Sequence, residues 1–429
     1  MTGYARPRCF GGVFCLPKNR MIPRFFRDPA DRFPALVPPP LRVPKKVTIQ
    51  HIDSRFFLRY NRRASCMHCN FFEWKRSDYF MDKQSEDVPL GPIRVGVVYN
   101  LKHADIVDTA PDGQAEYDSL DTVLAIERAI RKEGCQTVLI EADERLLTRL
   151  AEARPDIVFN IAEGRGGRAR EAQVPALLNL LHIPFTGSDE TTLCIALDKA
   201  LTKRLLSTYR IPTPRYRAFS PGDAVRAPSL RYPVIVKPNA EGSSKGIPDV
   251  CVAENAAEMK ALVQKNFALY GGSVLVEEFI GGREFTVGIL GNGADPHVFS
   301  PMEIVYHKTP VGGYNVYNYT VKQNYTEFVE YRCPADIPPL LEAEMKRLSK
   351  KIFSALGCRD FARIDFRLDG DGHIYFIEIN PLPGLAPGYS DYPMLAEFCG
   401  TPYDELVASV LRAGAAREGV SLERSVSAQ

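Results

Sequence analysis

Four residues near the C-terminal end could together bind a metal ion and a developing negative charge. Arg363 and Asp365 are two residues apart in one apolar run, and Glu378 and Asn380 are two apart in the next. Side chains on a strand alternate between its faces, so each pair shares a face. The Asp-Gly-Asp-Gly sequence at 369–372 predicts a hairpin between the runs. In register, one guanidinium and three oxygen-bearing side chains converge, and such hard oxygen ligands suit Mg²⁺ beside substrate phosphates. A solvated polar face on an edge hairpin is the alternative, which the otherwise apolar strands disfavour.

A second group of residues suits phosphate. Lys237 ends a buried strand predicted over 232–237, and Glu-Gly-Ser-Ser-Lys-Gly follows at 241–246. Glycines and small hydroxyls let backbone N–H groups approach phosphate oxygens. Lys199 lies on a helix predicted over 191–208. Neither the GxxxxGK[ST] nor the GxGxxG pattern is present, so those two nucleotide folds are not indicated. A plain turn and a solvated lysine remain alternatives.

Two acids seven residues apart, Glu277 and Glu284, could accept hydrogen bonds from ribose hydroxyls. The strands that carry them, 273–278 and 284–290, are predicted to join through a glycine turn. With a third strand over 298–304 their spacing favours an antiparallel meander. A charged hairpin corner is the alternative explanation of the two acids.

Strands and helices are predicted to alternate in the N-terminal part of the chain. Hydrophobic periodicity predicts, in order, strand 93–99, helix 120–132, strand 137–140, helix 146–153 and strand 156–160. This order implies a parallel sheet with right-handed crossovers, and so a small doubly wound α/β domain over 91–190. Further helices are predicted over 255–267, 338–356 and 401–413, within a second domain over 191–413, with a tail over 414–429.

The composition is that of an ordinary globular protein. The 429 residues carry a net charge of +2, with 45% hydrophobic and 25% charged residues. This mixture excludes collagen-like, coiled-coil and wholly disordered chains and suggests two or three domains. No apolar run reaches the roughly 18 residues of a membrane span. The near-neutral charge excludes a uniformly basic nucleic-acid-binding protein.

Residues 1–90 differ from the rest, with 17 Lys and Arg against 8 Asp and Glu and with ten prolines. We expect a weakly ordered extension that turnover does not need; a targeting segment, a nucleic-acid arm or an overlong translation start are the alternatives. Its Cys66 and Cys69 supply at most half of a zinc site. Ten scattered cysteines without a secretory apolar segment predict a reducing, cytoplasmic location.

Taken in order, these motifs resemble the ATP-grasp fold and, within it, the D-alanine–D-alanine ligase family. The resemblance covers about 93–413. Its most specific segments are Val-Lys-Pro at 236–238 with Glu-Gly-Ser-Ser at 241–244, Val-Glu-Glu-Phe-Ile at 276–280 with Arg-Glu-Phe-Thr at 283–286, and Arg-Ile-Asp-Phe at 363–366 with Glu-Ile-Asn-Pro at 378–381 and Pro-Gly at 383–384.

The resemblance implies an α/β ATP-grasp ligase that uses ATP and two Mg²⁺ ions, for which Mn²⁺ can substitute. Two lobes would clamp ATP, amino acids would be the small-molecule substrates, and a homodimer is the usual assembly. The implied ATP-binding residues are Lys199 and Lys237 at the phosphates, Glu277, Phe279 and Ile280 at the adenine, Glu284 at the ribose, and Ser244 and Lys322. The implied metal ligands are Asp365, Glu378 and Asn380. The implied catalytic and substrate residues are Arg363 and the N–H of Gly384 at the tetrahedral intermediate, Ser243 in the loop over the site, Glu116 at the first amino group and Ser390 at the second carboxylate.

The sequence departs from the family pattern only near the amino-acid sites. The usual Gly-Gly-x-Ser before Glu116 is absent, and 160–164 and 167–173 replace a His-Gly-x-x-Gly-Glu-Asp-Gly motif. Gln323 follows Lys322 where a Tyr is usual, and 308–315 looks inserted. Two enzymatic hypotheses follow: a D-alanine–D-alanine ligase for peptidoglycan, or a related ligase that makes another amide or an ester. A non-catalytic ATP-binding module is disfavoured because it need not keep Arg363.

Overall fold

The structure is a computed structural model that describes residues 91–102, 116–242, 251–310 and 312–423. These residues belong to one compact unit, Ser85–Gln429. Four sequence expectations lie outside them: the extension over 1–90, Cys66 with Cys69, the loop serines Ser243 and Ser244, and the end of the tail. None of the helices described is long and apolar enough to cross a membrane.

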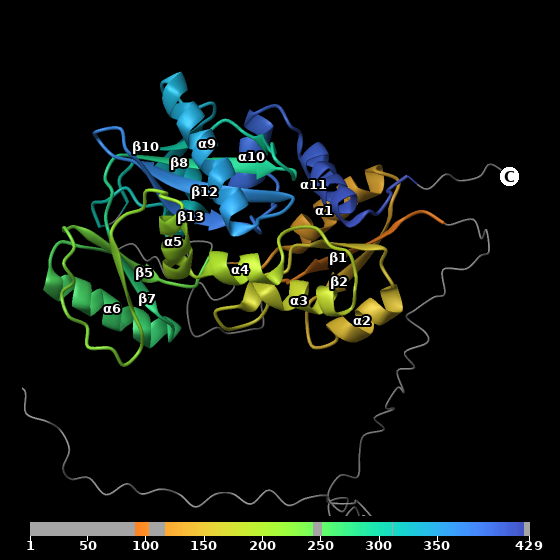
Figure 1. Cartoon of the computed structure of the whole chain (residues 1–429), viewed down its shortest axis with the longest axis horizontal. Coiled ribbons are helices and arrows are strands. Elements are labelled where there is room, and N and C mark those ends of the chain that lie inside the picture. Colours follow the sequence, from red (N-terminus) through yellow and green to blue (C-terminus); the bar gives the residue numbers. More distant parts are fainter. Residues whose placement is uncertain (1–90, 103–115, 243–250, 311, 424–429) are drawn as a thin grey trace, which may run out of the picture. The chain divides into compact units, whose positions relative to one another are not determined.

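The N-terminal part contains a three-stranded parallel sheet with helices on both faces (Figure 1). The central strand β1 pairs in parallel with β2 and β3. The five predicted elements are confirmed as β1 (Arg94–Tyr99), α1 (Leu120–Lys132), β2 (Gln136–Glu141), α2 (Leu146–Ala153) and β3 (Ile157–Asn160). Ser119 begins α1, because its side chain accepts a hydrogen bond from the N–H of Thr122 at 3.2 Å. The next helix of this part is α3 (Gln173–Leu180).

The single helix predicted over 191–208 is wrong, because the chain forms two helices, α4 (Glu190–Leu197) and α5 (Lys199–Thr208). Asp198 between them is extended, and its carboxylate accepts the N–H of Leu201 at 2.9 Å and the amide of Asn239 at 2.7 Å. Asp198 thus caps α5, and the break places Lys199 at the first turn of a new helix.

The two remaining sheets carry the rest of the chain. A four-stranded antiparallel sheet in the order β4-β7-β5-β6 packs on α6, and its elements are β4 (Tyr216–Phe219), β5 (Val234–Pro238), β6 (Val252–Ala253), α6 (Ala256–Tyr270) and β7 (Val274–Glu278). A six-stranded sheet in the order β11-β10-β8-β12-β13, with β9 beside β8, contains β8 (Arg283–Leu290), β9 (His297–Val298), β10 (Met302–Tyr306), β11 (Val329–Arg332), β12 (Phe361–Leu368) and β13 (Ile374–Asn380). The accompanying helices are α7 (Tyr319–Gln323), α8 (Tyr325–Phe328), α9 (Pro339–Leu356), α10 (Asp391–Phe398) and α11 (Tyr403–Glu418).

The predicted meander through 273–304 is confirmed only in its second half: β8 and β10 pair antiparallel, but β7 and β8 lie in different sheets. The glycines between them do not close a hairpin. Gly282 has φ +101°, and a Cβ there would lie 2.3 Å from the carbonyl oxygen of Leu368. The chain therefore passes against the end of β12 on its way from one sheet to the other, which only glycine permits.

The β12–β13 hairpin is confirmed, with Arg363 opposite Asn380 and Asp365 opposite Glu378. The last helix runs five residues beyond the predicted end at 413. It lies beside α1 and shares its apolar core (Figure 1). Near its end Arg417 pairs with the buried Asp360 at 2.8 Å, which explains why the helix continues.

Candidate active site

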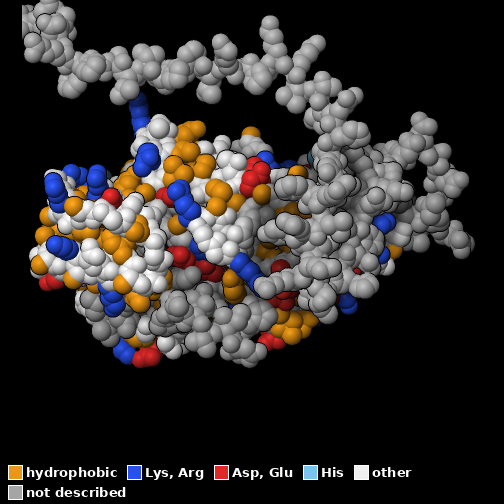
Figure 2. Space-filling model, turned by 90° about the horizontal axis from the view of Figure 1, so that it is seen from below, with side chains coloured by type: hydrophobic (Ala, Val, Ile, Leu, Met, Phe, Trp, Pro, Cys, Tyr) orange, Lys and Arg blue, Asp and Glu red, His pale blue; other side chains and the backbone are white. Residues whose placement is uncertain are grey.

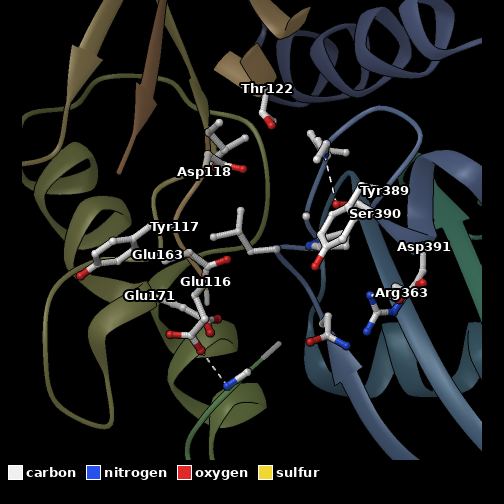
Figure 3. A pocket seen from close by; sticks show the side chains of 18 of the residues that line it. Glu116, Tyr117, Asp118, Thr122, Glu163, Glu171, Arg363, Tyr389, Ser390 and Asp391 are labelled. Atoms are coloured by element: carbon white, nitrogen blue, oxygen red, sulfur yellow. Dashed lines mark hydrogen bonds and ion pairs between the residues drawn. The ribbon is translucent and has the colours of Figure 1, made fainter. Parts of the chain in front are cut away.

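A cavity of about 410 Å³ separates the β12–β13 hairpin from the N-terminal part. Residues from three places line it: 116–122 and 161–171, the hairpin end with the loop 380–391, and Lys199, Glu241 and Gly242. Figure 3 shows Glu116, Glu163 and Glu171 on one wall, with Arg363, Ser390 and Asp391 across from them. On the face seen in Figure 2, acidic side chains occupy the hollow near the middle, while Lys and Arg are spread around its edge.

The hairpin brings its four polar residues together as the alternation predicted. Arg363 donates to both oxygens of Asp365, at 3.1 and 3.0 Å, and Asn380 lies 3.3 Å from the same carboxylate. Thr286 on β8 donates to Asp365 at 2.7 Å. Burial raises the pKa of Asp365, and Glu378 adds to this against the lowering effect of Arg363. Two carboxylates held opposite each other with an amide oxygen form a hard donor set that fits Mg²⁺.

The two predicted phosphate lysines approach this hairpin from other elements. Lys199 Nζ lies 3.3 Å from Glu378 Oε2, and it donates to the carbonyl oxygen of Glu241. Lys237 Nζ lies 2.9 Å from Glu277 Oε2. Burial alone would raise the pKa of Glu378, but Lys199, Lys237 and Arg363 lower it to about 2. The lysines and the carboxylates therefore form one electrostatic unit.

A third lysine, which sequence reasoning missed, completes this group. Lys203 is fully buried one turn after Lys199, and its Nζ lies 2.8 Å from Glu277 Oε1. Both oxygens of Glu277 are thus engaged by lysines. Burial lowers the pKa of Lys203 to about 8, although Glu277 opposes the shift. The spacing of four from Lys199 is the signal that places Lys203 on the same face.

The residues expected at the nucleoside line a second hollow next to the hairpin. Glu284 Oε2 accepts hydrogen bonds from Arg367 at 2.7 Å and Tyr306 at 2.8 Å. Arg367 also donates to the carbonyl oxygen of Ile280 at 2.7 Å and lies 4.9 Å from the centre of the Phe279 ring. Sequence reasoning gave Arg367 no role, although the alternation that pairs Arg363 with Asp365 places it on the same face. Lys322, partly buried, lines both hollows.

The loop after β13 brings the remaining predicted residues to the cavity. A Cβ on Gly384 would lie 2.9 Å from Ser390 Oγ, so only glycine fits beside that hydroxyl. Ser390 Oγ in turn accepts the N–H of Ala386 at 3.1 Å. Gln323 donates to the hydroxyl of Tyr389 at 2.7 Å across the cavity mouth.

Asp391 is a buried neighbour of Arg363 that the sequence did not reveal. Its Oδ2 lies 3.2 Å from Arg363, and its Oδ1 accepts from Tyr317 and Tyr331, each at 3.2 Å. Arg363 is therefore held between two carboxylates, Asp365 and Asp391. This clamp fixes the direction of the guanidinium that faces the cavity.

Glu116, which was predicted to bind the first amino group, lies beside Arg170 and Gly242. It forms a two-pronged ion pair with Arg170, whose Nε lies 3.0 Å from Glu116 Oε2. Glu116 Oε1 also accepts the N–H of Gly242 at 2.7 Å, and a Cβ on Gly242 would lie 2.8 Å from that oxygen. Arg170, Glu163 and Glu171 come from segments that depart from the family pattern, and no role was predicted for them.

Burial shifts three carboxyl groups of this wall upward. It raises the pKa of Glu171 to about 8 and that of Asp118 to about 7, and with Glu171 and Glu116 it raises that of Glu163. An acid whose folded pKa is raised binds more protons in the folded state between its two pKa values, so stability falls as pH rises there. Because one pKa unit is worth about 1.4 kcal/mol, we expect these groups to lower the unfolding free energy by several kcal/mol between pH 5 and 8.

Urea unfolding at several pH values measures this decline, and Glu171→Gln should flatten it. The exposed Glu152→Gln on α2 serves as the matched control and should keep the slope of the unsubstituted chain. A slope that Glu171→Gln leaves unchanged would show that Glu171 ionises normally in the folded protein.

Comparisons with known proteins identify the family. Residues 205–412 match the family described as the D-ala D-ala ligase C-terminus. The chain is 36% identical to the D-alanine–D-alanine ligase of Aquifex aeolicus over 299 residues, which are 68% of this chain and 94% of that protein. The chain belongs to the D-alanine–D-alanine ligase family. The enzyme of the same name from Bordetella petrii is 33% identical over 76% of this chain and 93% of its own length.

Family membership confirms the predicted enzyme class, an ATP-grasp ligase, and the fold agrees. A crystal structure of the D-alanine–D-alanine ligase from Bacillus anthracis complexed with ATP superposes with a TM-score of 0.61 at 20% identity, over 76% of this chain and 99% of that one. The family match of 205–412 contains the hairpin and Lys237, whereas Glu116, Glu163, Arg170 and Glu171 precede it. Lys199 and Lys203 also precede the matched residues, whereas Gly384 and Ser390 lie within them.

Proposed function

We propose that this chain uses ATP to join the carboxylate of one amino acid to the amino group of another, with D-alanine in both positions, for peptidoglycan synthesis. The observation that carries the proposal is the convergence of Arg363, Asp365, Glu378 and Asn380 with Lys199 around one cavity. Glu116 and Ser390 line the same cavity, which leaves room for two small substrates beside the phosphate-facing groups.

The reaction follows from the chemistry of the carboxylate, which cannot lose an oxygen to an amine at neutral pH without activation. Transfer of the γ-phosphoryl group to the carboxylate gives an acyl phosphate and ADP. The second amine attacks the acyl carbon, and the tetrahedral intermediate expels phosphate as the amide forms. Lys199 and Lys237 hold the phosphates, while Arg363 and the N–H of Gly384 receive the charge on the tetrahedral oxygen. Asp365, Glu378 and Asn380 would hold Mg²⁺, which neutralises charge on the transferred phosphoryl group when it is bound.

We place the nucleotide between the two sheets of 191–413, with Glu277, Phe279 and Ile280 at the base and Glu284 at the ribose. Because Arg367 and Tyr306 already bond Glu284, a ribose hydroxyl would share or replace those contacts. Ser243 and Ser244 belong to this proposal from the sequence alone. We further propose the domain boundaries given above, Mg²⁺ or Mn²⁺ as the ions, a cytoplasmic location and a homodimer.

A second candidate is a ligase of the same mechanism with another amino or hydroxy acid in one position. Gln323 at the cavity mouth and the acidic residues Glu163 and Glu171 favour this second candidate, because they face the substrates and not the nucleotide.

Phosphate release by the full chain with ATP and Mg²⁺, measured across D- and L-amino acids and D-lactate, distinguishes the two candidates. Release with D-alanine alone, with the dipeptide found by mass spectrometry, supports the first. Release only with other pairs supports the second. Absence of release with every pair, although ATP binds, would overturn the ligase reaction.

A further inference from the structure

Within the described residues, one wall of the cavity contains five carboxyl groups and one arginine that pairs with them. We call it the acidic wall and define it as Glu116, Asp118, Glu163, Glu171 and Glu241, all of which line the cavity. Figure 3 shows Glu163 and Glu171 directed toward the same space as Glu116. The residues come from two segments, 116–118 and 163–171, and from Glu241, which follows β5.

The nearby cations are engaged elsewhere. Arg170 pairs with Glu116 and lies 3.3 Å from Glu241 Oε2, and it also donates to the carbonyl oxygen of Ala240 at 2.9 Å. Lys199 is held by Glu378 and by the backbone of Glu241. Lys102 is exposed and acts on Asp118. Among the described residues, Arg170 is the buried cation that pairs directly with this wall, while Lys199 and Lys102 act on Glu171 and Asp118 without a hydrogen bond or ion pair to them.

Glu171 is the decisive member of the wall. Only 8% of its surface is exposed, and among residues 91–102, 116–242, 251–310 and 312–423 no group forms a hydrogen bond or ion pair with its carboxyl group, although Arg170 and Lys199 act on it electrostatically. Glu163, partly buried, likewise has no such partner within the described part of the chain. A buried carboxyl without a partner is costly, and natural sites of this kind are usually completed by a ligand.

Electrostatics favours a cation as that ligand. Burial and the neighbouring acids raise the pKa of Glu171 and of Glu163, so part of the wall is protonated without a ligand. A bound ammonium group would let these carboxyls ionise and would gain charge-assisted hydrogen bonds from them. One ammonium, the α-amino group assigned to Glu116, would leave Glu163 and Glu171 unmatched.

We propose that Glu163 and Glu171 bind a second ammonium group, on the side chain of the first substrate, so that this position prefers a diamino acid over D-alanine. The inference rests on the ligase reaction proposed above and specifies its second candidate, with a diamino acid in place of D-alanine at the first position. The wall opens into the cavity that holds Arg363 and Gly384, so an amino acid bound there has its carboxylate within reach of the reaction centre. A free divalent ion would satisfy the same carboxyls and is therefore an outcome of the test.

The test compares ornithine with norvaline, which has the same carbon chain without the amino group. The full chain receives ATP, Mg²⁺ and D-alanine as the second substrate, with either enantiomer of each first substrate. Phosphate release gives kcat/KM, and mass spectrometry of a product from ¹⁸O-labelled first substrate shows whose carboxylate was activated. We expect ornithine to exceed norvaline by about 10- to 100-fold, since charged hydrogen bonds of this kind contribute 1.5–3 kcal/mol.

Glu171→Gln and, separately, Glu163→Gln should reduce the ornithine-to-norvaline ratio toward one. Glu152→Gln, an exposed change on α2, should keep it. Thermal unfolding without ATP gives a second measurement: ornithine should raise Tm more than norvaline does, and Glu171→Gln should remove the difference.

Four results would overturn the inference. Equal kcat/KM for ornithine and norvaline, with D-alanine pairs active, removes the inference and leaves the ligase reaction standing. If the ratio of kcat/KM for ornithine over norvaline stays the same in both glutamine variants, the selectivity does not come from this wall. If Ca²⁺ raises Tm and ornithine does not, and Glu171→Gln removes the effect of Ca²⁺, the wall binds a metal ion and not an ammonium group. No release with any pair rejects the proposed function and, with it, this inference.

Discussion

Asp365→Asn should lower kcat by at least about a thousandfold while the protein remains folded. The substitution keeps the shape of the side chain and removes its charge. Asp365 is both a proposed metal ligand and the group that holds Arg363 through two hydrogen bonds, at 3.1 and 3.0 Å. Losing the charge would therefore weaken the proposed metal site and loosen the Arg363 guanidinium that we propose receives the tetrahedral oxygen. Steady-state phosphate release measures kcat, and circular dichroism shows whether the variant remains folded.

The same hairpin offers a matched control for this variant. Asp371 lies exposed in the turn between β12 and β13, and Asp371→Asn should leave kcat within about twofold, as is usual for surface changes away from a site. ATP binding, followed by a fluorescent analogue, should weaken in Asp365→Asn only in the presence of Mg²⁺. Turnover that stays within tenfold of the unsubstituted chain would show that the hairpin is not the reaction centre.

The sequence predicted the parts of the fold that depend on local pattern. Strand alternation placed Arg363 with Asp365 and Glu378 with Asn380, and the Asp-Gly turn fixed the register of their hairpin. Helical periodicity gave α1 and α2 with their observed ends. These features are local, because each is determined by residues that are close together in the sequence.

Features that depend on distant contacts were missed. Asp198 looked like one more polar residue in a helix, and its cap role depends partly on Asn239, which is 41 residues away. The separation of β7 from β8 depends on the approach of Gly282 to Leu368. Spacing between neighbours along the chain contains no information about either contact, so a hairpin was the natural interpretation.

The residues of the site also divide into those that local pattern predicts and those that depend on distant contacts. The positions of the hairpin residues and of Lys199 and Lys237 near them could be predicted, because motif and alternation identify these residues. Arg170 and Asp391 could not, since each acts through a partner from another element, and the burial of Glu171 depends on residues packed around it from elsewhere in the chain. A buried charge becomes visible only when the side chains around it are known, and the sequence alone gave these three no predicted role.

Glu277→Gln should be the most destabilising single change in the nucleotide half of the site. Glu277 is 1% exposed and pairs with Lys203 at 2.8 Å and Lys237 at 2.9 Å. Removing its charge leaves two buried ammonium groups without a carboxylate. Breaking a buried ion pair in this way costs about 3–5 kcal/mol, so we expect a loss of that size in the unfolding free energy measured with urea at pH 7.

Two companion variants separate charge from packing. Glu278→Gln changes the next residue of β7, which is also buried but pairs with Arg215 at the surface, and should cost about 1 kcal/mol. Adding Lys203→Met to Glu277→Gln removes one of the two unmatched ammonium groups and should recover part of the loss. A double variant less stable than Glu277→Gln would mean that Lys203 stabilises the fold through its other contacts, with Thr213 and the carbonyl oxygen of Ile377 at 2.9 Å.

The pH dependence of Glu277→Gln gives the sharpest check, because the sign is fixed by linkage. Burial already lowers the pKa of Lys203 to about 8 with Glu277 present, and without that carboxylate the pKa must fall further. A lysine whose folded pKa lies below its unfolded value binds fewer protons in the folded state between the two, so stability rises with pH over that interval. The deficit of the variant should therefore shrink between pH 7 and 10. A deficit that stays constant over this range would mean that the lysines remain charged and have found water or another acceptor, in which case Glu277 would not be what holds Lys237 toward the phosphates.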